Sequence, residues 1–98
     1  MVNVLEWWPD YGGQLLHVRT GRGGTPVELD RLPLSTSTVQ ALRRWVSSYA
    51  DERLPIEGSG DSDWVDEGVD LLRRCREELQ PDYEVVVTEP WWGDPPTE

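Results

Sequence analysis

The sequence predicts an α+β domain of two layers, in which two helices cover one face of a three-stranded, mainly antiparallel sheet. Two observations lead to this fold class. Apolar residues recur at helical spacing in two stretches in the middle of the chain. Shorter runs rich in β-branched and aromatic residues lie on both sides of them. A sheet with one apolar face needs a cover, which two amphipathic helices supply, so the predicted order is strand, strand, helix, helix, strand.

The N-terminal part of the chain predicts a β-hairpin. Residues 2–8 and 14–20 contain the β-branched and aromatic residues that are typical of strands. Between them, residues 9–13 begin with a proline and end with two glycines, which is typical of a turn. The glycine-rich residues 21–24 do not complete a phosphate-binding motif, because Pro26 stands where that motif needs its last glycine. We therefore expect a flexible turn there, followed by an extended segment.

The first helix is predicted over residues 36–53. Apolar residues recur at i, i+3 and i+7 from Val39, which is the spacing of an amphipathic helix and not of a strand. Ser35 stands before the helix as a natural N-cap, since its hydroxyl can accept from an otherwise unpaired backbone N–H. We expect Pro55 and the glycines after it to end the helix.

The second helix is predicted over residues 62–79, with Asp61 or Ser62 as its N-cap. Acidic residues gather in its first turns and arginines towards its C-terminus, which is the arrangement that the helix dipole favours. Gly68 leaves room for the close approach of another element. The apolar stripe of this helix consists of Trp64, Val65, Leu71, Leu72, Cys75 and Leu79.

The last strand is predicted over residues 83–89, where three consecutive valines indicate a central or near-central place in the sheet. The two helices return the chain so that this strand runs either parallel to the first strand or antiparallel to the second, and the sequence leaves both open. Residues 90–98 hold three prolines and predict no regular element. We therefore expect a single domain over residues 1–89 and a Trp/Pro-rich tail over residues 90–98.

The composition narrows the classes of partner. The formal net charge of -10 over 98 residues repels nucleic acid and anionic membranes and favours a basic partner. The single cysteine excludes an internal disulfide and is typical of a reducing cytosol. The N-terminus lacks the pattern of a signal peptide, and no stretch approaches the ~20 apolar residues of a membrane span. We therefore expect a cytoplasmic protein with no nucleic-acid or membrane partner.

Four motifs form an arrangement met in other proteins. They are LPLS at 32–35, Leu42 with Trp45 and Tyr49, Trp64 with Glu67-Gly68, and EELQPDYEV at 77–85. The arrangement resembles a group of small, acidic, mostly uncharacterised bacterial proteins, some of which look like the immunity partners of secreted polymorphic toxins. The resemblance covers about residues 26–88. Its motifs are core and capping positions, so it implies a fold and a class of partner rather than a catalytic site.

Six tryptophans include two adjacent pairs, Trp7-Trp8 and Trp91-Trp92. Neighbouring strand residues point to opposite faces, so at most one of Trp7 and Trp8 can enter the helix-covered core. One interpretation places Trp91 and Trp92 over the open face of the sheet, packed on Trp8. The other makes Trp8, Trp91 and Trp92 a partner-binding patch, since exposed tryptophan is enriched in interface hot spots.

An acidic cluster occupies the start of the second predicted helix and consists of Asp61, Asp63, Asp66, Glu67 and Asp70. It lacks the spacing of a calcium-binding loop and has no nearby nucleophile for acid–base chemistry. It is either a solvated helix face or a binding surface for a basic protein. His17 stands alone in a predicted strand. The sequence therefore predicts no catalytic, cofactor or metal site.

Charge, tryptophans and resemblance together predict a non-enzymatic immunity protein that binds and neutralises a basic protein partner. A secreted nuclease-type toxin would be one such partner. Two alternatives remain open: a nucleic-acid mimic that inhibits a DNA-binding protein, and a structural module that forms a homodimer through its tryptophan pairs.

Overall fold

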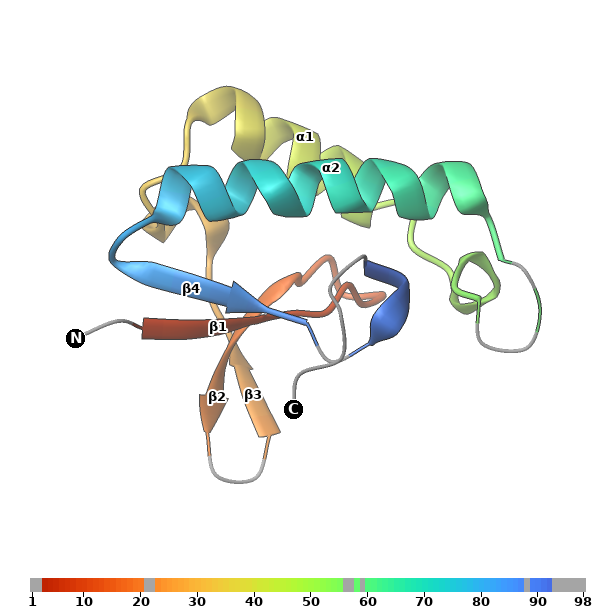
Figure 1. The fold of residues 1–98 in the computed structure, drawn as a ribbon, viewed down its shortest axis with the longest axis horizontal. Helices are drawn as coiled ribbons and strands as arrows, with labels where there is room; N and C mark the ends of the chain where they lie inside the picture. Colours follow the sequence, from red (N-terminus) through yellow and green to blue (C-terminus); the bar gives the residue numbers. More distant parts are fainter. Residues whose placement is uncertain (1–2, 21–22, 56–57, 59, 88, 93–98) are drawn as a thin grey trace.

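The computed structural model describes residues 3–20, 23–55, 58, 60–87 and 89–92. Two helices lie on one side of a single sheet (Figure 1), which confirms the α+β class and the helix cover predicted from the sequence. The main elements are β1 (Asn3–Trp7), β2 (Leu16–Thr20), β3 (Gly23–Pro26), α1 (Thr36–Val46), α2 (Ser62–Leu79) and β4 (Tyr83–Val86). Three short 3-10 turns accompany them: η1 (Leu29–Arg31), η2 (Asp51–Arg53) and η3 (Pro90–Trp92).

The sheet has four strands in the order β3-β2-β1-β4, so the prediction of three mainly antiparallel strands is wrong. The expected hairpin is present, since β1 and β2 are antiparallel with Leu5 opposite Val18. β4 pairs with β1 in parallel, with Leu5 opposite Val85. Of the two pairings that the sequence left open, the structure therefore adopts the parallel one.

The strand missing from the prediction is β3, which lies where we expected a flexible turn. It pairs antiparallel with β2, placing His17 opposite Pro26 and Thr20 opposite Gly23. Its glycines and proline have low strand propensity, so its composition gives no strand signal. Proline is tolerated because β3 is an edge strand, where one side of the backbone needs no partner. The connection at residues 21–22 lies outside the described residues.

β4 is also an edge strand, so the prediction of a central place for the valine run is wrong. It ends at Val86, before the residue 89 expected from the sequence. Val85 is buried against the helices, and its backbone carbonyl accepts a hydrogen bond from Arg76 Nε at 3.0 Å. The arginine side chain therefore supplies the hydrogen bond that a neighbouring strand would otherwise donate to this edge carbonyl.

α2 has the bounds predicted from the sequence, and Asp61 caps it by accepting from the backbone N–H of Trp64 at 3.1 Å. Ser35 caps α1 as predicted. However, α1 ends at Val46, well before the expected residue 53. The hydroxyls of Ser47 and Ser48 donate to carbonyls of the last turn of α1 and so compete with continued helix.

The interior between helices and sheet is built around tryptophan, as expected for Trp45 and Trp64. These two rings stack with centroids 4.2 Å apart, and each indole N–H donates to the other residue's carbonyl. Gly68 makes this stacking possible, because a Cβ at that position would collide with the Trp45 ring. Trp7 is fully buried beside Trp45, whereas Trp8 is 37% exposed, so only one residue of the pair enters the core.

Trp92 joins the same interior from η3. Its ring is 1% exposed and contacts the rings of Trp7, Trp45 and Trp64. The expectation that Trp92 packs on Trp8 across the open sheet face is therefore wrong. The stretch expected to lack regular structure contributes a 3-10 turn, and residues 93–98 lie outside the described residues.

Glu78 joins the C-terminal part of α2 to the start of α1. Its carboxylate accepts from the backbone N–H of Ser35 at 2.7 Å and from the hydroxyl of Thr38, which is fully buried. These hydrogen bonds lower the pKa of Glu78 below its ordinary value, although partial burial opposes them. No helix among the described residues is long and apolar enough to cross a membrane.

Candidate functional site

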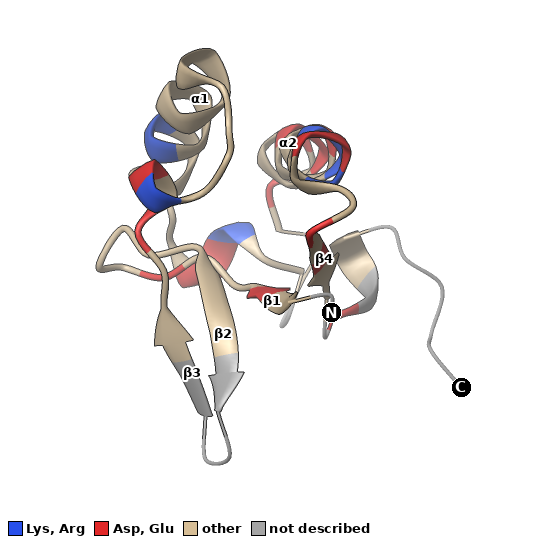
Figure 2. Ribbon diagram, turned by 90° about the vertical axis from the view of Figure 1, so that its left-hand side faces the viewer, with Lys and Arg blue, Asp and Glu red and all other residues tan. Residues whose placement is uncertain are grey.

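The acidic cluster predicted at the start of α2 divides into two parts. Asp61 is structural, because it caps α2 and its carboxylate pairs with Arg53 at 2.9 Å. The other members lie exposed on the N-terminal half of α2, whereas the arginines of this helix begin at Arg73 (acidic residues red and arginines blue in Figure 2). Asp70, the last member of the cluster, lies 3.5 Å from Arg73, the first arginine of α2. The remaining exposed carboxylates are those of Asp63, Asp66 and Glu67.

The three tryptophans predicted to bind a partner do not gather in one place. Trp92 is buried, so its ring contributes to the interior and is closed to a partner in this structure. Trp91 is half-buried beside it, with ring centroids 6.5 Å apart. Trp8 stands apart from both and contacts no other ring among the described residues. Of the three, Trp8 alone is exposed enough to present its ring to a partner.

Trp8 lines a hollow of about 700 Å³ between the end of β1 and the segment that joins the two helices. We call it the aromatic–acidic hollow, because aromatic rings and carboxylates line it together. Its two carboxylates belong to η2, and glycines close to the start of α2 complete it. Its lining residues are Trp8, Tyr49, Asp51, Glu52, Leu54, Gly58 and Gly60.

Hydrogen bonds hold this hollow in shape. The hydroxyl of Tyr49 donates to the carboxylate of Asp51, and the backbone N–H of Asp51 donates to the hydroxyl of Tyr11 at 2.9 Å. The Tyr11 and Tyr49 rings meet edge to face, 4.8 Å apart. Burial, followed by the hydrogen bond to Asp51, raises the pKa of Tyr49, so its hydroxyl remains a donor at neutral pH.

The negative charge of the hollow is not balanced within the described part of the chain. Neither Asp51 nor Glu52 forms an ion pair with a described cation. Arg53, the next residue, is engaged elsewhere: it pairs with Asp61 and lies 6.0 Å from the ring centroid of Trp64. The hollow therefore combines aromatic surface with uncompensated carboxylates.

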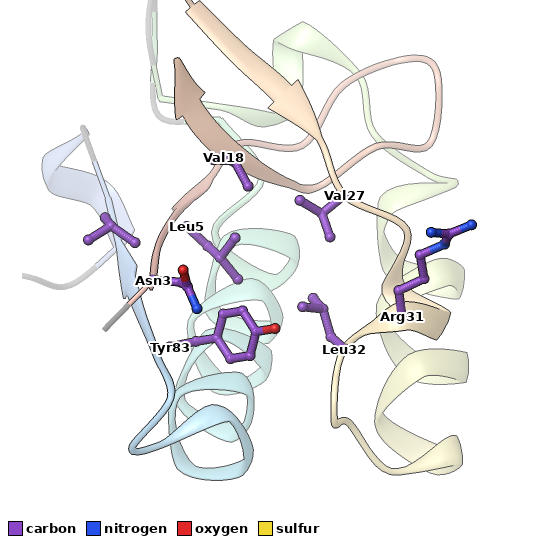
Figure 3. A pocket seen from close by; sticks show the side chains of 8 residues that line it. Asn3, Leu5, Val18, Val27, Arg31, Leu32 and Tyr83 are labelled. Atoms are coloured by element: carbon purple, nitrogen blue, oxygen red, sulfur yellow. The ribbon is translucent and has the colours of Figure 1, made fainter. Parts of the chain in front are cut away.

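A second hollow, of about 320 Å³, lies near the opposite end of β1 (Figure 3). We call it the apolar groove. The side chains of Leu5, Val27 and Leu32 point into a shared space, while that of Arg31 extends away from them. Val18 is 41% exposed there, although it lies opposite the buried Leu5 in the sheet. Asn3 and Tyr83 close one end of the groove.

The described residues offer no arrangement for metal binding: no group of three or more His, Cys, Asp or Glu side chains could hold an ion. Burial raises the pKa of the Cys75 thiol to about 12, which keeps it protonated at neutral pH. His17 lies in β2, as expected from the sequence. Its imidazole Nε2 is 3.1 Å from the carbonyl oxygen of Trp8.

Sequence reasoning missed most of the aromatic–acidic hollow. It placed Tyr49, Asp51 and Glu52 inside the first helix and assigned no role to Tyr11. The hydrogen bond from Asp51 to Tyr11 spans 40 residues of sequence, so no local pattern could indicate it. The one available signal was Trp8 itself, since a strand admits only one residue of an adjacent pair to the core.

Comparison with known proteins adds one finding. A family model described as Serratia CdiI immunity protein-like matches residues 3–90. This range runs from the first residue of β1 to the first residue of η3, so it spans both hollows and both helices. It confirms the resemblance to immunity partners that the sequence motifs indicated. A search among curated proteins finds no match.

Proposed function

The chain belongs to the Serratia CdiI immunity protein-like family, and we propose that it is a non-enzymatic immunity protein that binds a bacterial toxin and blocks it. The family match is the observation that carries this proposal, because it covers nearly the whole described chain. The function requires a surface complementary to the toxin and no chemistry of its own.

We further propose that the toxin surface in contact with this protein is basic. The formal net charge of -10 attracts such a surface and speeds the encounter. Exposed carboxylates on α2 and at the aromatic–acidic hollow supply local negative charge, and Trp8 supplies an exposed ring of the kind enriched in interface hot spots. A nuclease-type toxin, whose arginines and lysines hold its substrate, has a surface of this kind.

Neutralisation would follow from occlusion. Carboxylates of the immunity protein would pair with basic groups that the toxin needs for its substrate, while Trp8 would bury its ring against the toxin. Complementary charge would also exclude wrong partners, because like charges placed against each other cost several kcal/mol.

The test uses the protein encoded beside this one as the expected toxin. Co-expression should restore growth to cells that produce the toxin, and calorimetry should measure a complex of the two purified proteins. Raising the salt concentration should slow association if the toxin surface is basic. Light scattering at several concentrations tests the homodimer alternative in the same samples. Absence of both binding and protection would contradict the proposal.

A further inference from the structure

The aromatic–acidic hollow has the chemistry of a cation site for a side chain. Resting on the function proposed above, we propose that it receives an arginine side chain of the toxin, with the guanidinium against the Trp8 ring and paired with the carboxylates of Asp51 and Glu52.

The walls of the hollow favour a guanidinium over an ammonium. A planar guanidinium stacks on aromatic faces and donates to carboxylates in a fork, whereas an ammonium is a compact and strongly hydrated charge. The hollow offers both elements, an exposed indole and two carboxylates, within a volume of about 700 Å³. Such a volume admits a long side chain together with part of its backbone.

The electrostatic balance also favours a cation from outside. Asp10 fixes the loop that carries Tyr11 by accepting from the backbone N–H groups of Gly12 and Gln14. No described basic side chain pairs with Asp51 or Glu52. An incoming arginine would therefore meet two carboxylates that have no cationic partner among the described residues, one oxygen of Asp51 being bound by the Tyr49 hydroxyl.

The chain itself contains the arrangement that we propose for the complex. Next to the hollow, the Arg53 guanidinium carbon lies 6.0 Å from the centroid of the Trp64 ring while Nη1 lies 2.9 Å from Asp61. One guanidinium thus already sits between an indole and a carboxylate in this part of the fold. In the hollow, Trp8 and Glu52 likewise bring an indole and a carboxylate to one space.

The exposed carboxylates on α2 and the apolar groove each differ from this hollow in one of the two elements. α2 itself offers its exposed carboxylates no aromatic wall, since its one ring, that of Trp64, is buried. The apolar groove has aromatic and aliphatic walls but no carboxylate, and its charged residue is Arg31. The combination of ring and carboxylate therefore distinguishes the aromatic–acidic hollow from both.

The experiment measures affinity for the neighbouring toxin with single variants. Trp8→Ala and Glu52→Gln should each weaken binding about tenfold or more, because each removes one half of the guanidinium site. Glu84→Gln is the matched control: it removes one exposed carboxylate from β4, outside the hollow, and should change affinity by less than about twofold. Circular dichroism establishes that every variant is folded.

A second arm identifies the cation. Each toxin arginine and lysine is changed to Gln and combined with Glu52→Gln in double-mutant cycles. One arginine whose loss is non-additive with Glu52→Gln supports the proposal, whereas coupling to a lysine overturns the guanidinium assignment. Wild-type affinity in both hollow variants overturns the proposed site while leaving the immunity function standing. A toxin that does not bind the wild-type protein contradicts the function itself.

Discussion

Aromatic rings have different surroundings in the two regions where this protein gathers them. In the interior, the rings of Trp7, Trp45, Trp64 and Trp92 contact one another and are almost fully buried. In the aromatic–acidic hollow, Trp8 and Tyr49 line one open space together with carboxylates. The number of tryptophans therefore does not measure a binding surface. The neighbours of a ring, carboxylates or other rings, distinguish a candidate binding residue from a core residue.

Tyr49 connects the two regions. Its ring lies 6.0 Å from that of Trp64 in the interior and 4.8 Å from that of Tyr11 at the surface. The wall of the hollow is therefore anchored to the packed core, which limits the entropy that a partner must remove on binding. Five changes test this division between stability and binding, and they are given in order of decreasing expected effect.

Trp92→Ala should have the largest effect, and on stability. Removing a fully buried indole leaves a cavity beside Trp7 and Trp45, at a cost of about 3–5 kcal/mol in the free energy of unfolding. Denaturant unfolding measures this loss. Toxin affinity, measured where the variant is folded, should change little. A loss of affinity without a loss of stability would place Trp92 in the interface instead.

Gly68→Ala should be the next most harmful. The new methyl carbon would lie within 3.0 Å of three atoms of the Trp45 ring and force it from its stacking on Trp64, at about 1–3 kcal/mol. Gly58→Ala is the matched control for thermal unfolding, because a Cβ there meets no atom within 4 Å. Equal melting temperatures for the two variants would mean that the stacking is not constrained at Gly68.

Trp8→Ala should show the opposite behaviour to Trp92→Ala. Because Trp8 is 37% exposed and lacks a ring neighbour among the described residues, its loss should cost about 1–2 kcal/mol of stability, less than the loss of Trp92. Its effect on toxin affinity should be the tenfold loss expected above. Denaturant unfolding measures the loss of stability, and calorimetry on the same preparation measures the loss of toxin affinity. A large loss of stability with unchanged affinity would contradict the division.

Glu78→Gln should reduce stability by about 1 kcal/mol at neutral pH, because the backbone N–H of Ser35 and the hydroxyl of Thr38 donate to different carboxylate oxygens, and the amide keeps only one of these acceptors, without its charge. The pKa of Glu78 is lower in the folded state, so the carboxylate stabilises the fold above its unfolded pKa of about 4.3. This contribution disappears as pH falls through the folded pKa. The difference between wild type and variant should therefore shrink in unfolding curves recorded below about pH 4, and a difference that grows on acidification would contradict this linkage.

Val18→Ser should have the smallest effect. It makes the apolar groove more polar at an already exposed position, far from the aromatic–acidic hollow. Toxin affinity should stay within about twofold of wild type, as should that of the Glu84→Gln control. A tenfold loss of affinity would show that the groove contributes to the toxin interface and would weaken the distinction between the two hollows.

Elements with strong local signals were predicted from the sequence. Ser35 and Asp61 cap the helices as predicted, and α2 has its predicted bounds, because capping and apolar periodicity depend on nearby residues. β3 was missed because Gly23 and Gly24 have no strand preference and are ordered only by pairing with β2. The end of α1 was missed because it depends on serine hydroxyls rather than on the more obvious Pro55.

The candidate site was predicted less well than the fold. The exposure of Trp8 could be predicted from strand alternation. The other residues that line the hollow come mostly from the connection between the helices, and the packing of Tyr49 on Trp64 brings them close to Trp8. The burial of Trp92 likewise depends on a space left between α2 and the sheet. Tertiary packing determines these contacts between distant residues, so a local sequence pattern cannot predict them.

The contact between Trp7 and Trp92 has a consequence for folding during translation. Trp7 belongs to one of the first elements to be made, yet its ring is covered by a residue synthesised much later, and β1 must likewise wait for β4 to pair with it. The early hairpin therefore leaves the ribosome with its apolar face open. The nascent chain reaches its final packing only after Trp92 has been added, because contacts between distant residues cannot form before both are present.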